Sequence, residues 1–303
     1  MKLQDEIEIN IGNLTFDCRV SGNKDDELVL LLHGFPQSSY MWRRLMNDIS
    51  AQGHYCLAPD MRGYSKGARP SGKKHYTMEA LSKDVLDIVK HSGRKRFHLI
   101  GHDWGAVIGW KVVHDNPTSI LSWTGMSIPH WQAFGHAVMH DPEQKKMSGY
   151  IKRFQWPILP EVSIRKNDFA SFRKLWKCST QDEIENYLSI LRDKKALTAA
   201  LNYYRSNYKL LRSAAQRQIL GEIEVPTLFI WGEHDFGIGR TAAGMNHQYM
   251  KGYYAFLKLD GGHYLIESNY AGVSNAIKQH LAKFRSVPAR SNATGLSAAA
   301  PLS

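Results

Sequence analysis

The chain has 303 residues, enough for one large domain or two smaller ones, and 43% hydrophobic with 22% charged residues is an ordinary globular composition. This composition excludes global disorder and a fibrous repeat. Lys and Arg number 39 against 28 Asp and Glu, a net charge of +11. Residues 131–220 hold 16 basic and 8 acidic side chains, and their alternation at helical spacing favours a solvated helical surface over a nucleic-acid face.

The sequence contains no apolar run near the roughly 18 residues of a membrane helix. Its first 13 residues are polar and acidic, unlike a secretory signal peptide. The three cysteines, Cys18, Cys56 and Cys178, lie far apart in an odd number, which predicts neither a disulfide framework nor a zinc knuckle. We therefore expect a cytoplasmic protein without an integral membrane segment, as a monomer or a homodimer.

Through the first 130 residues, short apolar runs alternate with amphipathic stretches. The apolar runs, typical of strands buried on both faces, are Glu27–His33, His54–Ala58 and Phe97–Ile100. The amphipathic stretches, with apolar residues at helical spacing, are Ser39–Ala51, Thr77–His91 and Gly105–His114. Strands that alternate with helices predict an α/β fold with a mostly parallel sheet and helices on both faces.

The pattern changes at about residue 130. Residues 130–220 contain no run typical of a buried strand and are predicted to form helices and loops. Strand-like runs return at Pro226–Trp231 and Tyr254–Leu259, and an amphipathic helix follows from Tyr270 to Phe284. The sequence thus predicts a core in two parts, residues 1–129 and 221–284, split by a helical cap at 130–220. The small-residue tail, 285–303, is expected to be disordered.

The strongest signal for chemistry is the segment Gly101-His102-Asp103-Trp104-Gly105, between an expected strand and an expected helix. Small residues at both ends allow a tight, strained turn that lifts the middle side chain above the sheet, a nucleophile elbow. Here the middle residue is aspartate. A carboxylate can attack a saturated carbon that bears a leaving group, and the resulting ester can itself be cleaved. We interpret Asp103 as the nucleophile; the alternative is a glycine-rich turn with an ordinary surface acid.

Two later segments supply the partners that such a nucleophile needs. Asp235 ends the segment WGEHD after one apolar strand, and His263 ends the segment GGH after the next. Nucleophile, acid and histidine follow one another in this order in α/β-hydrolases. We therefore predict the triad Asp103–Asp235–His263. The alternatives for the acid are the neighbours Glu233 and His234 and, less strongly, Asp260.

The segment HGFP, residues 33–36, ends the first expected strand. A turn here can aim a backbone N–H into the space above the nucleophile, and the residue after the nucleophile supplies a second N–H. Two such donors would hold the oxyanion of a tetrahedral intermediate. We expect the backbone N–H groups of Phe35 and Trp104 to form this oxyanion hole.

Together, HGFP, GHDWG, WGEHD and GGH resemble the epoxide hydrolase branch of the α/β-hydrolase superfamily, which also contains the haloalkane dehalogenases. The resemblance covers roughly residues 5–285. It implies the α/β-hydrolase fold, with a mostly parallel sheet flanked by helices and a helical cap inserted between core strands. It also implies an epoxide hydrolase, which converts a small apolar epoxide and water to a vicinal diol through a covalent aspartyl ester. The resemblance implies no cofactor, no metal and no nucleic-acid partner.

Two cap segments extend the resemblance. Gly149–Gln155 (GYIKRFQ) is similar to the family's Tyr-x-x-x-Phe-Gln segment, and Leu201–Arg205 (LNYYR) to its Asn-aromatic-Tyr-Arg segment. In the family each segment supplies a tyrosine that hydrogen-bonds the epoxide oxygen, which carries over to Tyr150 and Tyr204. The chain has 14 tyrosines, so a packed core tyrosine is the alternative for each.

The chain departs from the family pattern at Ser65-Lys66-Gly67, where glycine followed by serine is usual. That loop is not catalytic, so the departure leaves the implied chemistry intact. The dehalogenase branch commonly has asparagine where this chain has Phe35, and fluoroacetate dehalogenases carry arginines near the elbow that residues 104–109 lack. These differences argue against a dehalogenase, but a dehalogenase with the same nucleophile is still the nearest alternative function. A non-catalytic binding protein on a hydrolase scaffold is the alternative from a different class.

Aromatic side chains near these positions predict an apolar pocket, for which the candidates are Phe35, Trp104, Trp131, Phe154 and Trp156. Of these we expect Phe35, Trp104, Phe154 and Trp156 to contact the substrate.

Two further patterns indicate ordinary structure. His136 and His140 are four residues apart but lack the glutamate of the zinc-protease motif, which favours a helix-surface pair. Gly101, Gly105 and Gly109 do not form a dinucleotide fingerprint, because the loop carries an acid that would repel phosphate.

Overall fold

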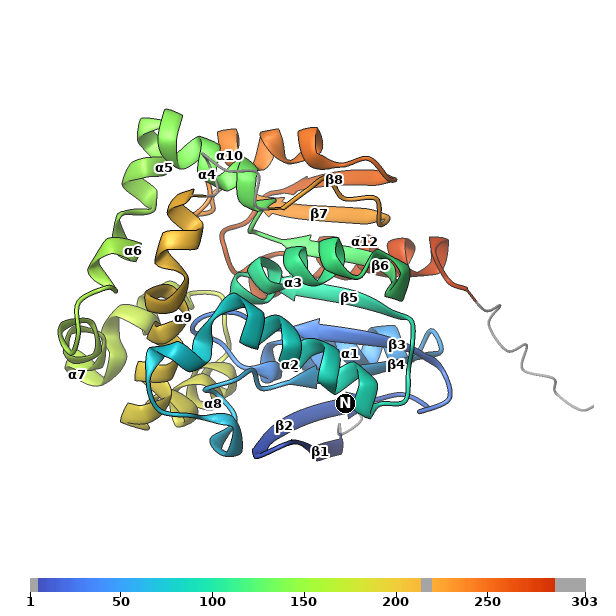
Figure 1. Ribbon diagram of the computed structural model, residues 1–303, viewed down its shortest axis with the longest axis horizontal. Helices are drawn as coiled ribbons and strands as arrows, with labels where there is room; N and C mark the ends of the chain where they lie inside the picture. Colours follow the sequence, from blue (N-terminus) through green and yellow to red (C-terminus); the bar gives the residue numbers. More distant parts are fainter. Residues whose placement is uncertain (1–4, 214–219, 287–303) are drawn as a thin grey trace, which may run out of the picture.

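An eight-stranded β-sheet runs through the centre of the molecule in the order β1-β2-β4-β3-β5-β6-β7-β8 (Figure 1). The structure is a computed structural model, and it describes residues 5–213 and 220–286. β2 pairs antiparallel with β1 and β4, and all other pairs are parallel. The strands are β1 Asp5–Ile11, β2 Leu14–Ser21, β3 Glu27–Leu32, β4 His54–Pro59, β5 Phe97–His102, β6 Ile120–Met126, β7 Thr227–Gly232 and β8 Tyr254–Leu259.

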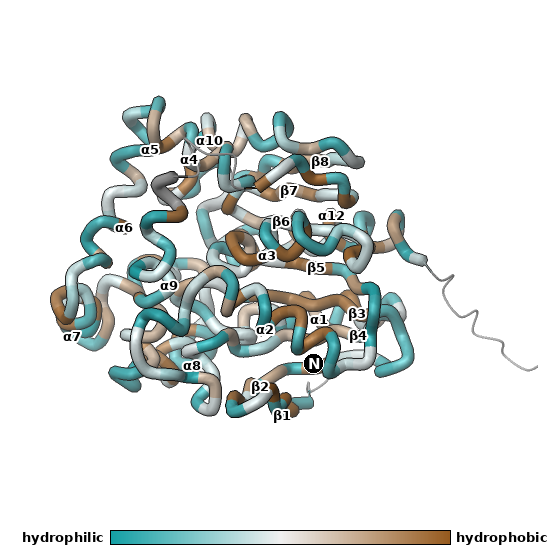
Figure 2. Tube along the Cα trace, viewed as in Figure 1, coloured by the Kyte–Doolittle hydropathy of each residue, from teal (hydrophilic) through white to brown (hydrophobic). Residues whose placement is uncertain are grey.

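Helices cover both faces of this sheet. α2 and α3 lie in front of the sheet in Figure 1, whereas α1 and α12 lie behind it. Every residue of β5, β6 and β7 is buried, and hydrophobic residues gather in the central strands (Figure 2). Burial on both faces explains why parallel strands appear in the sequence as near-continuous apolar runs. The core helices are α1 Arg43–Ser50, α2 Met78–His91, α3 Trp104–Asp115, α10 Arg240–Met245, α11 Leu265–Ser268 and α12 Tyr270–Lys283.

The five strands predicted from apolar runs are present as β3, β4, β5, β7 and β8. The predicted helices are present as α1, α2, α3 and α12, although Ser39–Trp42 forms a 3₁₀ turn before α1 begins. The sequence did not reveal β1, β2 or β6. β1 is a mostly exposed edge strand with little apolar signal. In β6 the polar residues Ser122 and Thr124 interrupt the run, although both are buried.

Among the described residues between β6 and β7, six helices cover the carboxyl ends of the parallel strands (Figure 1). They are α4 Trp131–His140, α5 Pro142–Met147, α6 Gly149–Arg153, α7 Leu159–Leu175, α8 Gln181–Leu191 and α9 Lys194–Ser213. α7 consists of two helical pieces, because Lys166–Phe169 have non-helical backbone angles. Residues 130–213, which are most of the predicted cap, are therefore helices and loops, as expected. The boundaries of the cap at 130 and 220 stay a prediction.

Within the described ranges, no helix combines the length and the apolar composition that crossing a bilayer needs. The first two residues of the predicted tail contact the core: Arg285 donates to the Gln52 carbonyl at 2.9 Å and the Ser286 N–H to Glu27 Oε1 at 2.9 Å. The remainder of the tail, 287–303, lies outside the described residues.

The turn between β5 and α3 is tight enough to require glycine. A Cβ atom on Gly105 would lie 2.1 Å from the backbone oxygen of Leu32, and one on Gly101 would lie 2.5 Å from the backbone oxygen of Gly105. Neither oxygen can move without displacing a strand or a helix. Glycine at both positions is therefore what lets α3 start directly over the end of β3.

We predict that Gly105→Ala lowers the free energy of unfolding by about 1–3 kcal/mol, since the methyl group forces backbone apart in a packed core. Urea denaturation measures this change. Gly149→Ala is the matched control, because a Cβ there meets no atom within 4 Å. Equal stabilities of the two variants would contradict the close approach of α3 to β3.

Candidate active site

Asp103 occupies the turn between β5 and α3 with a backbone conformation that is rare outside glycine. Its φ is 49° and its ψ is −119°, and its carbonyl accepts the N–H groups of Ala106 and Val107 in the first turn of α3. A non-glycine residue in this region is strained, and such residues cluster at functional sites. The residue is 5% exposed, so the strained turn holds a buried carboxylate at the floor of the site.

The HGFP segment lies directly against this carboxylate. The Phe35 N–H donates to Asp103 Oδ1 at 2.7 Å. A Cβ on Gly34 would lie 2.4 Å from the Asp103 Cβ, so only glycine allows this approach. Trp104 is the first residue of α3, and its N–H therefore has no partner within the helix. The two N–H groups predicted to form an oxyanion hole thus belong to backbone on either side of Asp103.

His263 and Asp235 complete the predicted triad. His263 Nδ1 lies 2.9 Å from both carboxylate oxygens of Asp235, and His263 Nε2 lies 3.5 Å from Asp103 Oδ2. Asp235 Oδ1 also accepts the N–H groups of Gly237 and Ile238, at 2.7 and 3.1 Å. These bonds fix the acid, which in turn fixes the imidazole. The three side chains come from the ends of β5, β7 and β8, as the sequence predicts.

Charge controls the protonation of the buried imidazole. Burial lowers the pKa of His263, but the carboxylates of Asp235 and Asp103 outweigh burial and raise it to about 10. In the resting site His263 is therefore a cation between two anions. His102, whose ring centroid lies 5.1 Å from that of His263, has its pKa lowered to about 4 by burial and by the charge of His263, and so stays neutral.

Tyr150 on α6 and Tyr204 on α9 face the same cavity from the cap. Their ring centroids are 6.0 Å apart, and Tyr204 packs edge-on against Trp104 at 4.9 Å. Burial, the nearby Asp103 carboxylate and, for Tyr204, the adjacent Tyr150 raise the pKa of both hydroxyls. Both are therefore protonated donors at neutral pH. Tyr203 is different, because its hydroxyl donates to the Arg62 carbonyl at 2.7 Å.

The cavity beneath the cap has a volume of about 950 Å³ and contains Asp103, His263 and both tyrosines in its wall. Phe35 and Phe154 also line it, and their rings pack at 5.8 Å. Trp156 lies at its mouth with 63% of its surface exposed. Trp104 and Trp131 line a smaller adjoining pocket, which shares Asp103, His263 and both tyrosines with the cavity. The Trp131 indole N–H donates to the Val107 carbonyl at 2.9 Å.

The alternatives for the triad acid lie elsewhere. Glu233 pairs with Lys258 at 2.8 Å, and His234 pairs with Asp260 at 3.2 Å, both on the surface. The rings of His136 and His140 on α4 contact each other in a tilted arrangement, with centroids 4.4 Å apart.

Among the residues that the sequence interpretation overlooked, three lie at or beside the triad. Tyr264 and Phe236 line the cavity, and each directly follows a triad residue, a position that could have drawn attention to them. Gln144 on α5 binds the loop after Asp235: its Nε2 donates to the Gly237 carbonyl at 2.8 Å and its Oε1 accepts the Gly239 N–H at 2.7 Å. No sequence signal pointed to Gln144, since the contact spans 95 residues.

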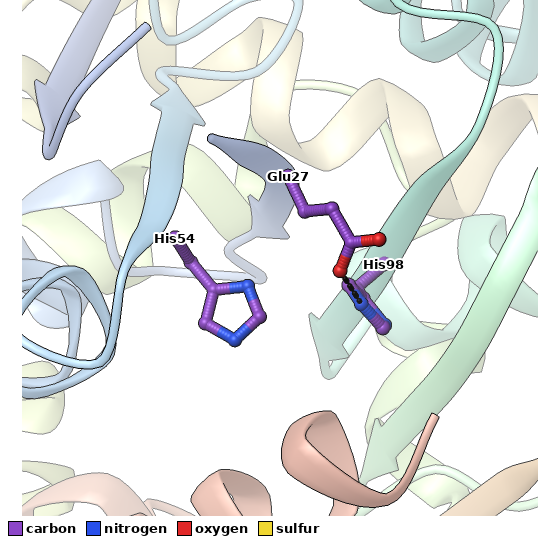
Figure 3. Close-up of side chains that lie close together, drawn as sticks. All are labelled: Glu27, His54 and His98. Carbon is purple, nitrogen blue, oxygen red and sulfur yellow. Dashed lines mark hydrogen bonds and ion pairs between the residues drawn. The ribbon is translucent and has the colours of Figure 1, made fainter. Parts of the chain in front are cut away.

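Two groups of described residues have possible metal-ligand atoms within 4.8 Å of one another: Glu27, His54 and His98, and Glu233, His234 and Asp260. The first group (Figure 3) lies at the amino ends of β3, β4 and β5, whereas the triad residues follow the carboxyl ends of their strands. There Glu27 Oε2 pairs with His98 at 3.4 Å and Oε1 accepts from Ser286. Burial, His98 and the Arg285 cation lower the pKa of His54 to about 4. The Glu27 carboxylate thus already accepts hydrogen bonds, and the Arg285 cation nearby would repel a metal ion. We therefore interpret the group as a buried hydrogen-bond cluster.

The fold and this arrangement define the class of the protein: a nucleophile elbow faced by a histidine–aspartate pair is the site of an α/β hydrolase. A family model described as the alpha/beta hydrolase fold matches residues 27–270. Epoxide hydrolase 3 of Xenopus tropicalis is 31% identical over 287 residues, with 91% of this chain and 77% of that protein covered.

Two further comparisons point the same way. The AB hydrolase superfamily protein YfhM of Bacillus subtilis is 28% identical over 279 residues, with 90% of this chain and 96% of that protein covered. A Bacillus megaterium epoxide hydrolase crystallised with an inhibitor shares the fold, with a TM-score of 0.83 at 24% identity and coverage of 91% and 100%. The chain therefore belongs to the epoxide hydrolase branch of the α/β-hydrolase superfamily, and it is a hydrolase.

The raised pKa of His263 predicts a specific pH dependence of stability. Because the folded pKa, about 10, lies above the ordinary value of 6.5, the stabilisation is complete below pH 6.5 and is lost as the pH rises through 10. We expect the free energy of unfolding of the wild type, minus that of His263→Gln, to fall steadily over this window. Denaturant titrations at several pH values measure it. A difference that stays constant from pH 6.5 to 10 would contradict the charged triad.

Proposed function

We propose that this protein hydrolyses a small apolar epoxide to a vicinal diol through a covalent ester of Asp103. One observation carries the proposal: a carboxylate at the elbow and two protonated tyrosine hydroxyls face each other across one apolar cavity. The carboxylate is a nucleophile for an epoxide carbon, and the hydroxyls are donors for the oxygen that the opening ring releases. Phe35, Trp104, Phe154 and Trp156 would contact the apolar part of the substrate.

In the first step the Asp103 Oδ2 oxygen attacks an epoxide carbon and the ring C–O bond breaks. Oδ2 suits this task because Oδ1 is held by the Phe35 N–H at 2.7 Å. Tyr150 and Tyr204 stabilise the developing alkoxide and give it a proton. The product is a glycol monoester of Asp103, whose carbonyl oxygen, Oδ1, is already in the oxyanion hole.

The second step follows from the change of charge that the first step makes. Esterification removes the negative charge of Asp103, one of the two charges that raise the pKa of His263. The pKa of His263 then falls. His263 gives its proton to the tyrosine that protonated the alkoxide, and this tyrosine is a neutral hydroxyl again. Neutral His263, held by Asp235, takes a proton from water as the water attacks the ester carbonyl. The N–H groups of Phe35 and Trp104 hold the oxyanion, and the diol leaves with a proton from His263. The carboxyl group that remains at Asp103 then gives its proton to His263, which restores the resting charges of both side chains.

The alternatives are less well supported. A dehalogenase of this branch commonly binds the departing halide with an asparagine side chain, whereas the side chain of Phe35 is apolar and packs on Phe172 at 5.4 Å. A binding protein without activity has no need for a histidine that bonds one acid at 2.9 Å and faces a second at 3.5 Å. Release of halide from haloalkanes would identify a dehalogenase.

Further features of the proposal stay predictions. No cofactor or metal is required, because nucleophile, acid and base are all side chains. Residues 1–129 and 221–284 would form the catalytic core, with 130–220 as its cap. The cytoplasmic location rests on the separated cysteines, of which Cys18 and Cys56 are buried free thiols. Whether the chain is a monomer or a homodimer is open to measurement.

The decisive experiment is to trap the ester. Wild-type protein should convert aliphatic or aryl epoxides to diols, whereas His263→Ala should form the ester and fail to hydrolyse it. The mass of the intact variant should then rise by the mass of one epoxide. The double variant with Asp103→Ala is the control and should gain no mass. An unmodified His263→Ala protein that still binds the epoxide would rule out a carboxylate nucleophile.

The cap tyrosines provide a second test. Loss of one donor to a developing oxyanion typically costs about 10²–10³ in rate, so Tyr150→Phe and Tyr204→Phe should each slow ester formation by that order. The double variant should nearly abolish it. Tyr203→Phe is the matched control, because its hydroxyl is occupied by the Arg62 carbonyl. Single-turnover kinetics measure the rates. Normal rates in both single variants, or a slow Tyr203→Phe, would show that the roles are misassigned.

A further inference from the structure

The outer edge of the cap exposes large apolar side chains. Trp156, Ile158, Leu159 and Val162 are 63%, 69%, 63% and 54% exposed, and Leu175 is 36% exposed. We call these five residues the cap rim. They belong to α7 and the turn before it, at the edge of the molecule farthest from β8 and α12 in Figure 1. Contiguous exposed apolar residues on a protein surface mark a site of interaction.

The cap rim surrounds the mouth of the active-site cavity. Trp156, Leu159 and Leu175 line that cavity while they are exposed to solvent. Ile158 and Val162 lie beside them, one helical turn apart, since the Val162 N–H donates to the Ile158 carbonyl at 2.9 Å. A partner molecule or membrane bound to the cap rim would therefore cover the entrance through which a substrate reaches the cavity.

Positive charge surrounds the same entrance. Residues 145–177 hold 9 basic side chains and only 2 acidic ones, much of the excess of the whole chain. Both acids are already paired, Glu161 with Arg205 at 2.8 Å and Asp168 with Arg173 at 2.5 Å. The exposed cations without an ion pair to any described residue include Lys146, Lys152, Arg153, Lys166 and Lys174.

We propose that the cap rim docks on an anionic lipid bilayer, and that the cavity takes its substrate from that bilayer. The second half of this statement rests on the proposed epoxide hydrolysis; the first half does not. Aliphatic side chains and a tryptophan enter the boundary between headgroups and acyl chains, while lysines around them bind anionic headgroups. An epoxide dissolved in the acyl chains then enters the apolar cavity without crossing water.

The observations favour a bilayer over two other occupants. A nucleic acid would use the cations but would leave Ile158, Leu159 and Val162 in water. A second copy of this chain, related by a two-fold axis, would bring two clusters of positive charge together. An anionic bilayer satisfies both the apolar residues and the charge.

Vesicle binding tests the docking without any turnover. Full-length protein should sediment with phosphatidylcholine vesicles that contain about one third phosphatidylserine, should bind pure phosphatidylcholine far less, and should be released by about 1 M salt. The double change Ile158→Ser and Val162→Ser, and the triple change of Lys152, Lys166 and Lys174 to Gln, should each weaken binding roughly tenfold or more. None of these five side chains lines the cavity.

Two controls match these variants. Met139→Ser removes an apolar side chain that is 42% exposed on α4. Changing Lys24, Lys90 and Lys95 to Gln removes the same charge from exposed positions near the amino ends of the core strands, away from the cap. Both controls should bind anionic vesicles as the wild type does.

Turnover tests the delivery of substrate. The cap-rim double variant should lose activity on a long-chain 1,2-epoxyalkane in anionic vesicles and keep its activity on styrene oxide in buffer. Failure to hydrolyse either epoxide despite vesicle binding would refute the proposed function alone. Wild-type hydrolysis without vesicle binding would refute the docking alone.

Three other results would also overturn the docking. The cap-rim double variant could bind vesicles as the wild type does, or the wild type could bind an oligonucleotide and not vesicles. The third result is a wild-type dimer that becomes a monomer in the cap-rim double variant but not in the control variants.

Discussion

The contact between the Asp103 carboxylate and the Phe35 N–H, 2.7 Å long, is the interaction on which the rest of the site depends. It requires a glycine at position 34, because any side chain there would collide with Asp103, and a positive φ at Asp103 itself. It also leaves Oδ2 as the carboxylate oxygen that faces His263. One hydrogen bond thus distinguishes two chemically equivalent oxygens and gives each a separate task in the proposed reaction.

The same geometry links the two proposed steps through charge. His263 carries a proton because two carboxylates, Asp103 and Asp235, are close to it in a buried space. An ester at Asp103 removes one of these charges, and the imidazole becomes a base only after there is an ester to hydrolyse. The order of the steps therefore follows from electrostatics, and no conformational change is needed to impose it.

The sequence predicted the parts of the protein that depend on local patterns. Asp103, Asp235 and His263 each follow an apolar strand, so their convergence at one edge of a parallel sheet follows from topology. β6 was missed because Ser122 interrupts the apolar run. Ser122 is nevertheless buried, because its hydroxyl hydrogen-bonds the His98 imidazole, 24 residues away in the sequence. Gln144 was also missed because its role depends on residues far away in the sequence. It hydrogen-bonds Gly237 and Gly239, and a short stretch of sequence around Gln144 does not indicate these contacts.

Two charged regions of opposite sign have separate tasks in this molecule. The cavity floor holds two carboxylates and one imidazole, so a substrate with a carboxylate near its reacting carbon would be repelled at the nucleophile. The floor thus favours a neutral electrophile such as an epoxide. The basic side chains lie outside, around the cavity mouth, where solvent screens them from the reaction. If the cap rim docks on a bilayer as we propose, their charge selects the surface that the mouth meets, and that surface then selects which neutral epoxides reach the nucleophile.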